Sequence, residues 1–123
     1  MKFRPFLLLL ILFTISSCNG QTATNIKSVS AEIFAKKINE TPKAQILDVR
    51  TPEEFDSEKI DNAINVDWLG DSFVTDIAKL DQSKPVFVYC KSGGRSSKAA
   101  AKVAESGFKN IYELDGGILK WNA

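Results

Sequence analysis

Apolar and polar residues alternate along the chain in a pattern typical of an α/β protein. Short apolar runs predict four buried strands, at residues 45–49, 63–66, 85–89 and 111–114. Apolar residues at helical spacing, capping residues and a run of alanines predict helices at 31–39, 71–80, 96–106 and 117–121, and a shorter one that opens at Thr51. Strands without a polar face that alternate with helices predict a parallel sheet covered on both sides. In such sheets ligands bind beyond the carboxyl ends of the strands.

Residues at the ends of these segments support the helix predictions. Ser30 is placed to cap the helix at 31–39. Thr51, Pro52 and Glu54 occupy the N-cap, first and third positions of the short helix, which is the pattern of a capping box. Gly107 follows the alanine-rich segment and is expected to end that helix.

The first 17 residues have a different character from the rest. Lys2 and Arg4 precede an unbroken apolar run at residues 6–13. The run is shorter than the roughly 20 residues that a membrane-spanning helix needs, and it fits a secretory signal peptide. A buried helix is the alternative, but it leaves the basic start and the small residues that follow unexplained.

Residues 15–18, Ile-Ser-Ser-Cys, resemble a bacterial lipobox. The resemblance implies that Cys18 receives lipid and becomes the mature N-terminus, with residues 18–25 as a polar tether and 26–123 as the domain. It also implies a protein of the cell envelope that is anchored to a membrane and faces the periplasm, and Asn19 points to the outer membrane. Ordinary signal cleavage is the alternative; it would leave Cys18 as a free or disulfide-bonded thiol.

Composition narrows the chemistry. The chain has 123 residues, which predicts one domain besides the leader, and a net charge of +1, which gives no reason to expect nucleic-acid binding. It contains no histidine, so catalysis of the Ser-His-Asp or Cys-His type is excluded and a zinc site is not expected. We expect neither a metal nor an organic cofactor.

The segment CKSGGRS, residues 90–96, links the strongest strand to the alanine-rich helix. Free backbone N–H groups at a helix start, together with Gly93 and Gly94, can surround an anion. A thiol at Cys90 would also experience the charges of Lys91 and Arg95, and such surroundings lower a thiol pKa. The alternative is a core cysteine that merely ends a strand, since cysteine is among the most buried residue types.

Four stretches together resemble the rhodanese family: ILDVRTPEEF (46–55), KIDNAINVD (59–67), VYCKSGGRS (88–96) and LDGGILKW (114–121). They occur in the order and at the spacing of that family. The resemblance implies a rhodanese-like α/β fold, with a small, mostly parallel five-stranded sheet flanked by helices on both faces. It implies sulfurtransferase activity, in which a small anionic donor such as thiosulfate gives its sulfane sulfur to a thiol or cyanide acceptor.

The resemblance also implies roles for individual residues. Cys90 would be the catalytic residue that becomes a persulfide, and the loop around its sulfur would consist of Lys91, Ser92, Gly93, Gly94, Arg95 and Ser96. Basic residues in that loop favour anionic donors. Asp48 and Arg50 match a structural pair, and Arg50 is expected to meet a carboxylate such as Glu54. Gly116 and Gly117 are interpreted as turn glycines and Trp121 as a core aromatic residue.

The chain departs from the family pattern in one segment. Lys59 stands where the family often has histidine, and Asn62 stands where it has glycine, so the local turn is uncertain. Related phosphatases use a Cys-x5-Arg loop, whereas Cys90 and Arg95 form a shorter Cys-x4-Arg loop that suits a sulfur atom better than a phosphoryl group. A non-catalytic module that carries sulfur or binds a partner is the competing interpretation.

Overall fold

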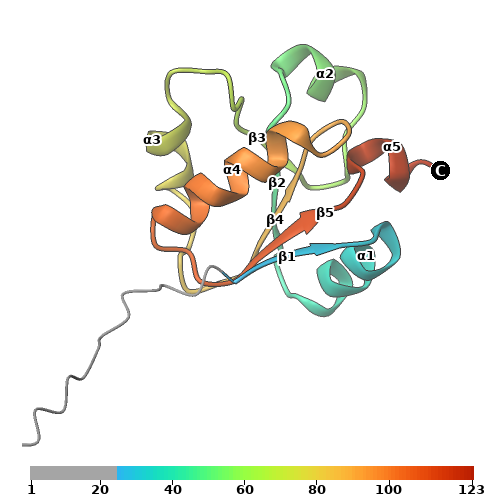
Figure 1. Cartoon of the computed structure of the whole chain (residues 1–123), viewed down its shortest axis with the longest axis horizontal. Helices are drawn as coiled ribbons and strands as arrows, with labels where there is room; N and C mark the ends of the chain where they lie inside the picture. The colour runs from blue at the N-terminus through green and yellow to red at the C-terminus, as the bar shows by residue number, and fades with distance from the viewer. Residues whose placement is uncertain (1–24) are drawn as a thin grey trace, which may run out of the picture.

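Five parallel strands form the central layer of the protein (Figure 1). The computed structural model describes residues 25–123, so the predicted signal segment, Cys18 and the tether up to residue 24 lie outside it. The strands are β1 (Ile26–Val29), β2 (Gln45–Asp48), β3 (Ile64–Asn65), β4 (Val86–Tyr89) and β5 (Ile111–Leu114), in the spatial order β1-β5-β4-β2-β3. Every strand pair is parallel, which confirms the predicted fold class.

Helices connect the strands at close to the predicted positions. They are α1 (Ala31–Glu40), α2 (Pro52–Ser57), α3 (Phe73–Ile77), α4 (Gly94–Glu105) and α5 (Gly117–Trp121). The predicted caps are confirmed: Ser30 Oγ accepts from Ile33 N at 3.3 Å, and Thr51 forms a capping box with Glu54. Helix α4 begins two residues earlier than predicted, at Gly94.

The pattern of apolar residues did not reveal β1. This strand has the sequence IKSV, and only its two ends, Ile26 and Val29, are even half-buried. It lies at the edge of the sheet and pairs with β5 alone, so it is not covered on both faces as the central strands are. A strand of four residues with two polar ones gives a weak sequence signal.

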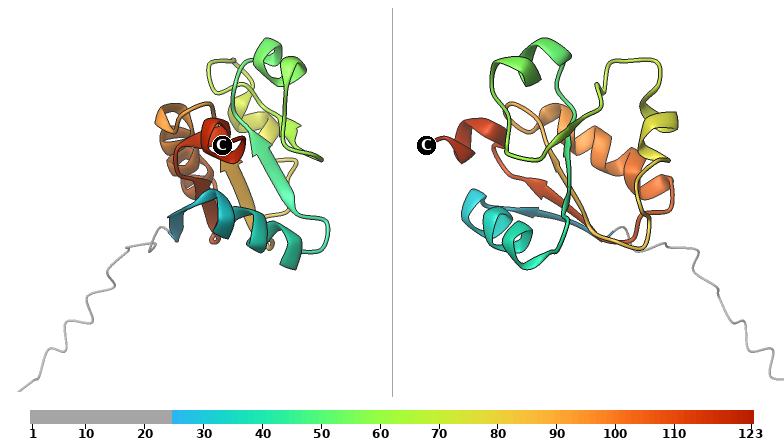
Figure 2. Two further views of the ribbon diagram at one scale, coloured as in Figure 1. Left: turned by 90° about the vertical axis from the view of Figure 1, so that its right-hand side faces the viewer. Right: turned by 180° about the vertical axis from the view of Figure 1, so that it is seen from behind.

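The sheet is covered on both faces, and each face has its own apolar cluster. Helix α4 lies in front of the sheet in Figure 1, and the view from behind in Figure 2 brings α1 forward. On the α4 face, Val88 and Ile111 pack with Ala99, Ala100 and Val103. On the α1 face the members are Phe34, Ile46, Ile60, Phe87, Tyr89, Leu114 and Ile118, with Trp121 partly buried against them. The Phe34 ring meets those of Phe87 and Trp121 edge-on at 5.6 and 6.1 Å, so Trp121 borders the core.

The carboxyl ends of the strands share one edge, where the β4–α4 loop lies. Figure 1 shows α2 and α5 on either side of this loop. Within residues 25–123, no helix has the length and apolar character needed to cross a bilayer.

Candidate active site

Cys90 directly follows β4, and its side chain is only 1% exposed. Gly93 N donates a hydrogen bond to Cys90 Sγ at 3.0 Å. Burial by itself raises the pKa of the Cys90 thiol, but hydrogen bonds from Ser96 and from the backbone amides of Gly93 and Ser92 outweigh it, and the net pKa is lowered. Cys90 is therefore both a buried strand end and the centre of a donor-rich loop.

The conformation of the loop depends on one of its two glycines. Gly93 has φ +118°, in the left-handed region, and stands as the N-cap of α4. Gly94 does not have a positive φ, and a Cβ built there would meet nothing within 4 Å. The special backbone conformation of the loop is therefore at Gly93, whereas Gly94 serves as an ordinary first residue of α4.

Helix α5 holds the loop from the other side. Ile118 N donates to Cys90 O at 2.9 Å, and Leu119 N donates to Lys91 O at 3.2 Å. Gly116 and Gly117 have φ of +77° and +62°, which confirms them as turn glycines. Gly117 also permits a close approach, because a Cβ there would lie 2.3 Å from Lys91 O. Its role thus extends beyond the turn to the position of the loop backbone.

Arg50 binds Asp48, its partner in the predicted structural pair, and not the expected Glu54. Arg50 Nη2 lies 2.7 Å from Asp48 Oδ2, and both side chains are almost completely buried. Arg50 Nη2 also donates to Glu58 O at 2.6 Å, so this pair ties the end of β2 to the segment after α2. The predicted scaffold pair of Asp48 and Arg50 is therefore present.

Arg95 takes the carboxylate that was expected to bind Arg50. Its two terminal nitrogens donate to Glu54 Oε1 and Oε2 at 2.6 and 3.0 Å. The hydrogen bond from Arg95 lowers the pKa of Glu54 to about 2. Arg95 is therefore neutralised by Glu54 in this structure, whereas Lys91 is exposed to solvent.

Ser96 joins the loop to a residue that the sequence analysis missed. Its hydroxyl oxygen lies 3.4 Å from Cys90 Sγ, 3.2 Å from Gly93 O and 3.0 Å from Glu113 Oε1. Ser96 is completely buried, and Glu113, on β5, is 8% exposed. The available signal was a carboxylate in the short apolar segment IYEL, at a position where a covered strand would carry an apolar side chain.

The turn that departs from the family pattern has asparagine in the left-handed region of backbone conformation. Asn62 has φ +67°, a conformation that asparagine tolerates better than most residues do. Ala63 N donates to Ile60 O at 3.1 Å and closes the turn. Lys59 lies with Nζ 4.5 Å from the centre of the Phe55 ring, a cation–π contact.

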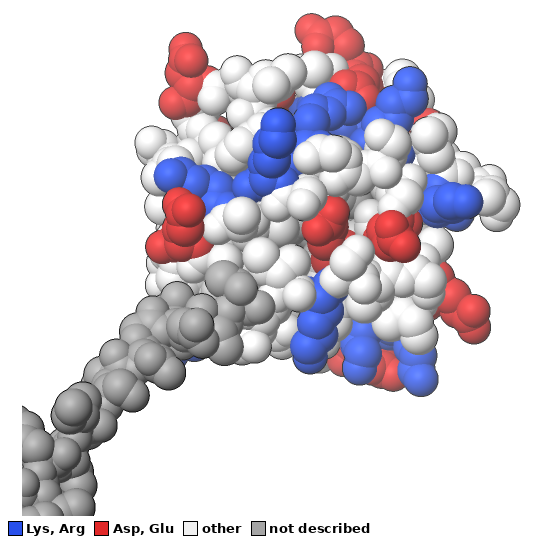
Figure 3. Space-filling model, viewed as in Figure 1, with Lys and Arg blue, Asp and Glu red and all other residues white. Residues whose placement is uncertain are grey.

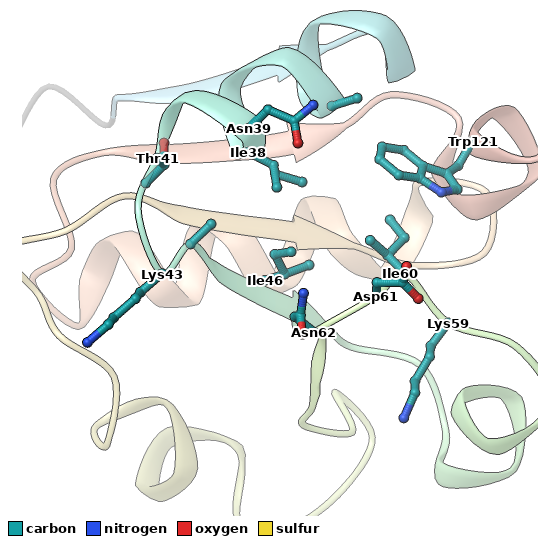
Figure 4. Close-up of a pocket in the computed structure, with 12 residues that line it drawn as sticks. Ile38, Asn39, Thr41, Lys43, Ile46, Lys59, Ile60, Asp61, Asn62 and Trp121 are labelled. Carbon is teal, nitrogen blue, oxygen red and sulfur yellow. The ribbon is translucent and has the colours of Figure 1, made fainter.

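The surface carries a row of basic side chains on one face and a groove on the other. Figure 3 shows basic side chains in a row over α4, which carries Arg95, Lys98 and Lys102. A groove on the opposite face lies between α1 and the turn at residues 59–62, with Trp121 at one end (Figure 4). Its lining includes no residue of the Cys90 loop, so it is separate from the thiol.

Comparison with known proteins agrees with this geometry. A family model described as a rhodanese-like domain matches residues 30–123. The chain belongs to the rhodanese family. A thiosulfate sulfurtransferase GlpE from Pseudomonas savastanoi pv. phaseolicola is 38% identical to this rhodanese over 80 residues, which cover 65% of this chain and 74% of that relative. A second GlpE, from Shewanella oneidensis, is 33% identical over 86 residues and is covered to 83%.

More distant relatives share the domain within other proteins. A tRNA uridine(34) hydroxylase from Erwinia tasmaniensis is 30% identical over 100 residues, but the chain spans only 29% of its length. The crystal structure of a rhodanese-like domain protein from Staphylococcus aureus superposes with a TM-score of 0.68 at 26% identity, covering 77% of this chain and 90% of that one. The rhodanese-like fold is therefore common to proteins with different full-length activities.

Proposed function

We propose that this rhodanese is a sulfurtransferase that carries a sulfane sulfur as a persulfide on Cys90. Membership of the family and the GlpE relatives support sulfur transfer in general. The observation that carries the proposal for this chain is the set of hydrogen-bond donors around Cys90 Sγ, which lowers the thiol pKa without any histidine.

The reaction has two displacement steps. The Cys90 thiolate attacks the outer sulfur of a donor such as thiosulfate; a new S–S bond forms, the bond to the inner sulfur breaks, and sulfite leaves with the electron pair. A cyanide or thiolate acceptor then attacks the outer sulfur of the persulfide and releases the Cys90 thiolate. The backbone amides around Sγ stabilise the negative charge of the Cys90 thiolate and of the Cys90 persulfide. Because the donor product leaves before the acceptor reacts, ping-pong kinetics are expected.

Lys91 and Arg95 would hold the anionic part of the donor. Lys91 is exposed and available, whereas Arg95 must share its guanidinium with Glu54 or release it. Gly93 N reaches Sγ itself at 3.0 Å, so the short Cys-x4-Arg loop encloses the sulfur atom closely. This closeness supports a sulfur site over a phosphate site.

Mass spectrometry distinguishes sulfur transfer through Cys90 from a module that only binds a partner. The intact mass of the full chain should increase by one sulfur after exposure to thiosulfate, and cyanide should remove that sulfur as thiocyanate. Cys90→Ser should gain none, whereas Cys18→Ser is the matched control and should react like wild type. If wild type gains no sulfur from any sulfane donor tried, the binding module is the correct function.

Lipid anchoring through Cys18 in the cell envelope is part of the same proposal. It rests on the basic start, the apolar run and the lipobox-like residues 15–18. Fractionation tests it, because wild type should accompany membranes whereas Cys18→Ser should remain unprocessed by lipoprotein maturation. A Cys18→Ser protein that is processed and membrane-bound as before would contradict the anchor.

A further inference from the structure

Glu113 is a buried carboxyl group that the sulfur-transfer steps do not use. It lies on β5 between β1 and β4, in register with Ser28 and Val88. Its side chain is 8% exposed and points to the face that α4 covers, where Ile111 is completely buried. A carboxylate at such a position is unfavourable unless hydrogen bonds or charges compensate for its burial. Its hydrogen-bond partner is the neutral hydroxyl of Ser96.

Ser96 connects this carboxyl group to the nucleophile. Its oxygen is 3.0 Å from Glu113 Oε1 and 3.4 Å from Cys90 Sγ. A serine hydroxyl has one hydrogen, so Ser96 cannot donate to the carboxylate and to the thiolate at the same time. When Glu113 is ionised, Ser96 donates to it and accepts from the Cys90 thiol. When Glu113 is protonated, it can donate to Ser96, and the hydroxyl hydrogen is then available to the Cys90 thiolate and to Gly93 O, which lies 3.2 Å from Ser96 Oγ.

We propose that Glu113 takes up the thiol proton of Cys90 through Ser96, so that the nucleophile forms beside a neutral carboxyl group. The S–H bond of Cys90 breaks and its proton passes to Ser96 Oγ, while the original Ser96 hydroxyl proton moves to Glu113. One proton is relocated, and no oxidant or other reactant is needed. Glu113 is a positioning residue in this scheme, because it acts through Ser96.

The pKa shifts of Glu113 and Cys90 favour this proton transfer. Burial raises the pKa of Glu113, and the nearby Asp115 carboxylate raises it further, whereas the hydrogen bond from Ser96 lowers it by less. The pKa of Cys90 is lowered against its burial by Ser96 Oγ and by the backbone amides of Ser96, Gly93 and Ser92, and the backbone donors remain when the hydroxyl donates to Glu113. The two groups therefore approach each other in proton affinity, which is the condition for sharing one proton.

Basic side chains on the neighbouring elements are directed elsewhere. On α4, Arg95 is bound to Glu54, and Lys98 is exposed. On β1, Lys27 lies 5.7 Å from the centre of the Tyr112 ring, on the other face of the sheet from Glu113. The remaining α4 residues against this part of the sheet include Ala99 and Ala100, which carry no charge. Ser96 is thus the link through which Glu113 and Cys90 communicate.

The proposal predicts that the thiolate forms in two steps as pH rises. Loss of the first proton leaves one proton shared between the two groups, so that a fraction of the molecules carries the thiolate beside neutral Glu113. Loss of the second proton leaves both groups charged and completes the thiolate. In Glu113→Gln the amide can donate to Ser96 but cannot ionise. The thiolate should then form in one step, with a midpoint about one pH unit below the upper step of the wild type, because that upper step takes place beside an ionised Glu113.

Alkylation of Cys90 by iodoacetamide measures this directly. The rate is followed across pH on the full chain, through the mass of the peptide that contains Cys90. The proposal rests on the proposed function in treating Cys90 as the nucleophile, but alkylation needs no sulfur donor. A protein that fails to transfer sulfur can therefore still confirm or contradict the proton path.

Three comparisons make the test specific. Asp115→Asn, which removes an exposed carboxylate from the end of the same strand, should keep the two-step profile. Ser96→Ala should raise the midpoint, because the thiolate loses a donor. In the Ser96→Ala background, Glu113→Gln should shift the midpoint by less than half as much as it does alone. Thermal unfolding verifies that each variant is folded.

Two results would overturn the proposal. The first is a Glu113→Gln profile that superimposes on wild type while the variant is folded. The second is an equal shift from Glu113→Gln with and without the Ser96 hydroxyl, since that would show a through-space charge effect and not a hydrogen-bonded path.

Discussion

Replacement of Gly117 by alanine tests whether α5 positions the loop that contains Cys90. A Cβ at this position would lie 2.3 Å from Lys91 O, 2.4 Å from Lys91 C and 2.5 Å from Cys90 O. All three are backbone atoms of the loop, so no side-chain rotation can relieve the contact. The loop and α5 must therefore move apart, and the bonds from Ile118 N and Leu119 N to the loop carbonyls must lengthen.

The expected loss of stability follows from two contributions. Alanine at φ +62° is disfavoured by about 1–2 kcal/mol, and overpacking against fixed backbone adds roughly 1–3 kcal/mol. Gly117→Ala should therefore lower the free energy of unfolding by about 2–5 kcal/mol. Urea unfolding followed by tryptophan fluorescence measures this, and sulfur gain from thiosulfate should slow in the protein that remains folded.

Gly94→Ala is the matched control on the other side of the loop. Gly94 lacks a positive φ and has open space at its Cβ position, so its replacement should leave the free energy of unfolding unchanged or raise it by up to about 1 kcal/mol. If Gly117→Ala unfolds within about 0.5 kcal/mol of wild type, the close approach of α5 does not constrain the loop and the reasoning is wrong.

Two further substitutions examine the ion pairs. Glu54→Gln should free Arg95 for the donor anion and lower the KM for thiosulfate up to about fivefold at similar kcat, because a part-exposed ion pair contributes up to roughly 1 kcal/mol. Replacement of the exposed Glu53 by glutamine is the control. If the KM of Glu54→Gln is unchanged, Glu54 does not compete with the donor anion for Arg95. Asp48→Asn should leave Arg50 without its buried counter-charge and reduce the free energy of unfolding by about 3–5 kcal/mol in urea titrations. Exposed Asp61→Asn should have no such effect, and equal stability of both variants would contradict a structural role for the buried pair.

The sequence predicted those parts of the fold that depend on neighbouring residues. The caps at Ser30 and Thr51 are local hydrogen bonds, so residue type and spacing were sufficient to find them. Strand β4 was found because all four of its residues are apolar or aromatic and buried. Strand β1 was missed because its pairing with β5 joins residues that are far apart in the sequence.

The pairing of the two arginines was predicted only in part: Asp48 and Arg50 were expected as a structural pair, but Glu54 was assigned to Arg50 and no carboxylate to Arg95. Glu54 is close to Arg50 in the chain, but the end of β2 turns Arg50 back onto Asp48, two residues before it. The approach of α2 to the β4–α4 loop then places Glu54 against Arg95, which is 41 residues away. The link from Ser96 to Glu113 is likewise a product of packing between α4 and β5.

The position of β5 also has a consequence for how the protein folds. The last strand lies between β1 and β4, and β1 has no other neighbour in the sheet. A chain made from its N-terminus must therefore leave a gap beside β4 until residues 111–114 arrive. Parallel pairing between distant segments is intrinsically slow because loop closure precedes the stabilising contacts. During that interval β1 is unpaired and Cys90 O lacks its hydrogen bond from Ile118 N. The loop around Cys90 therefore reaches its final position only after the last strand and helix have formed.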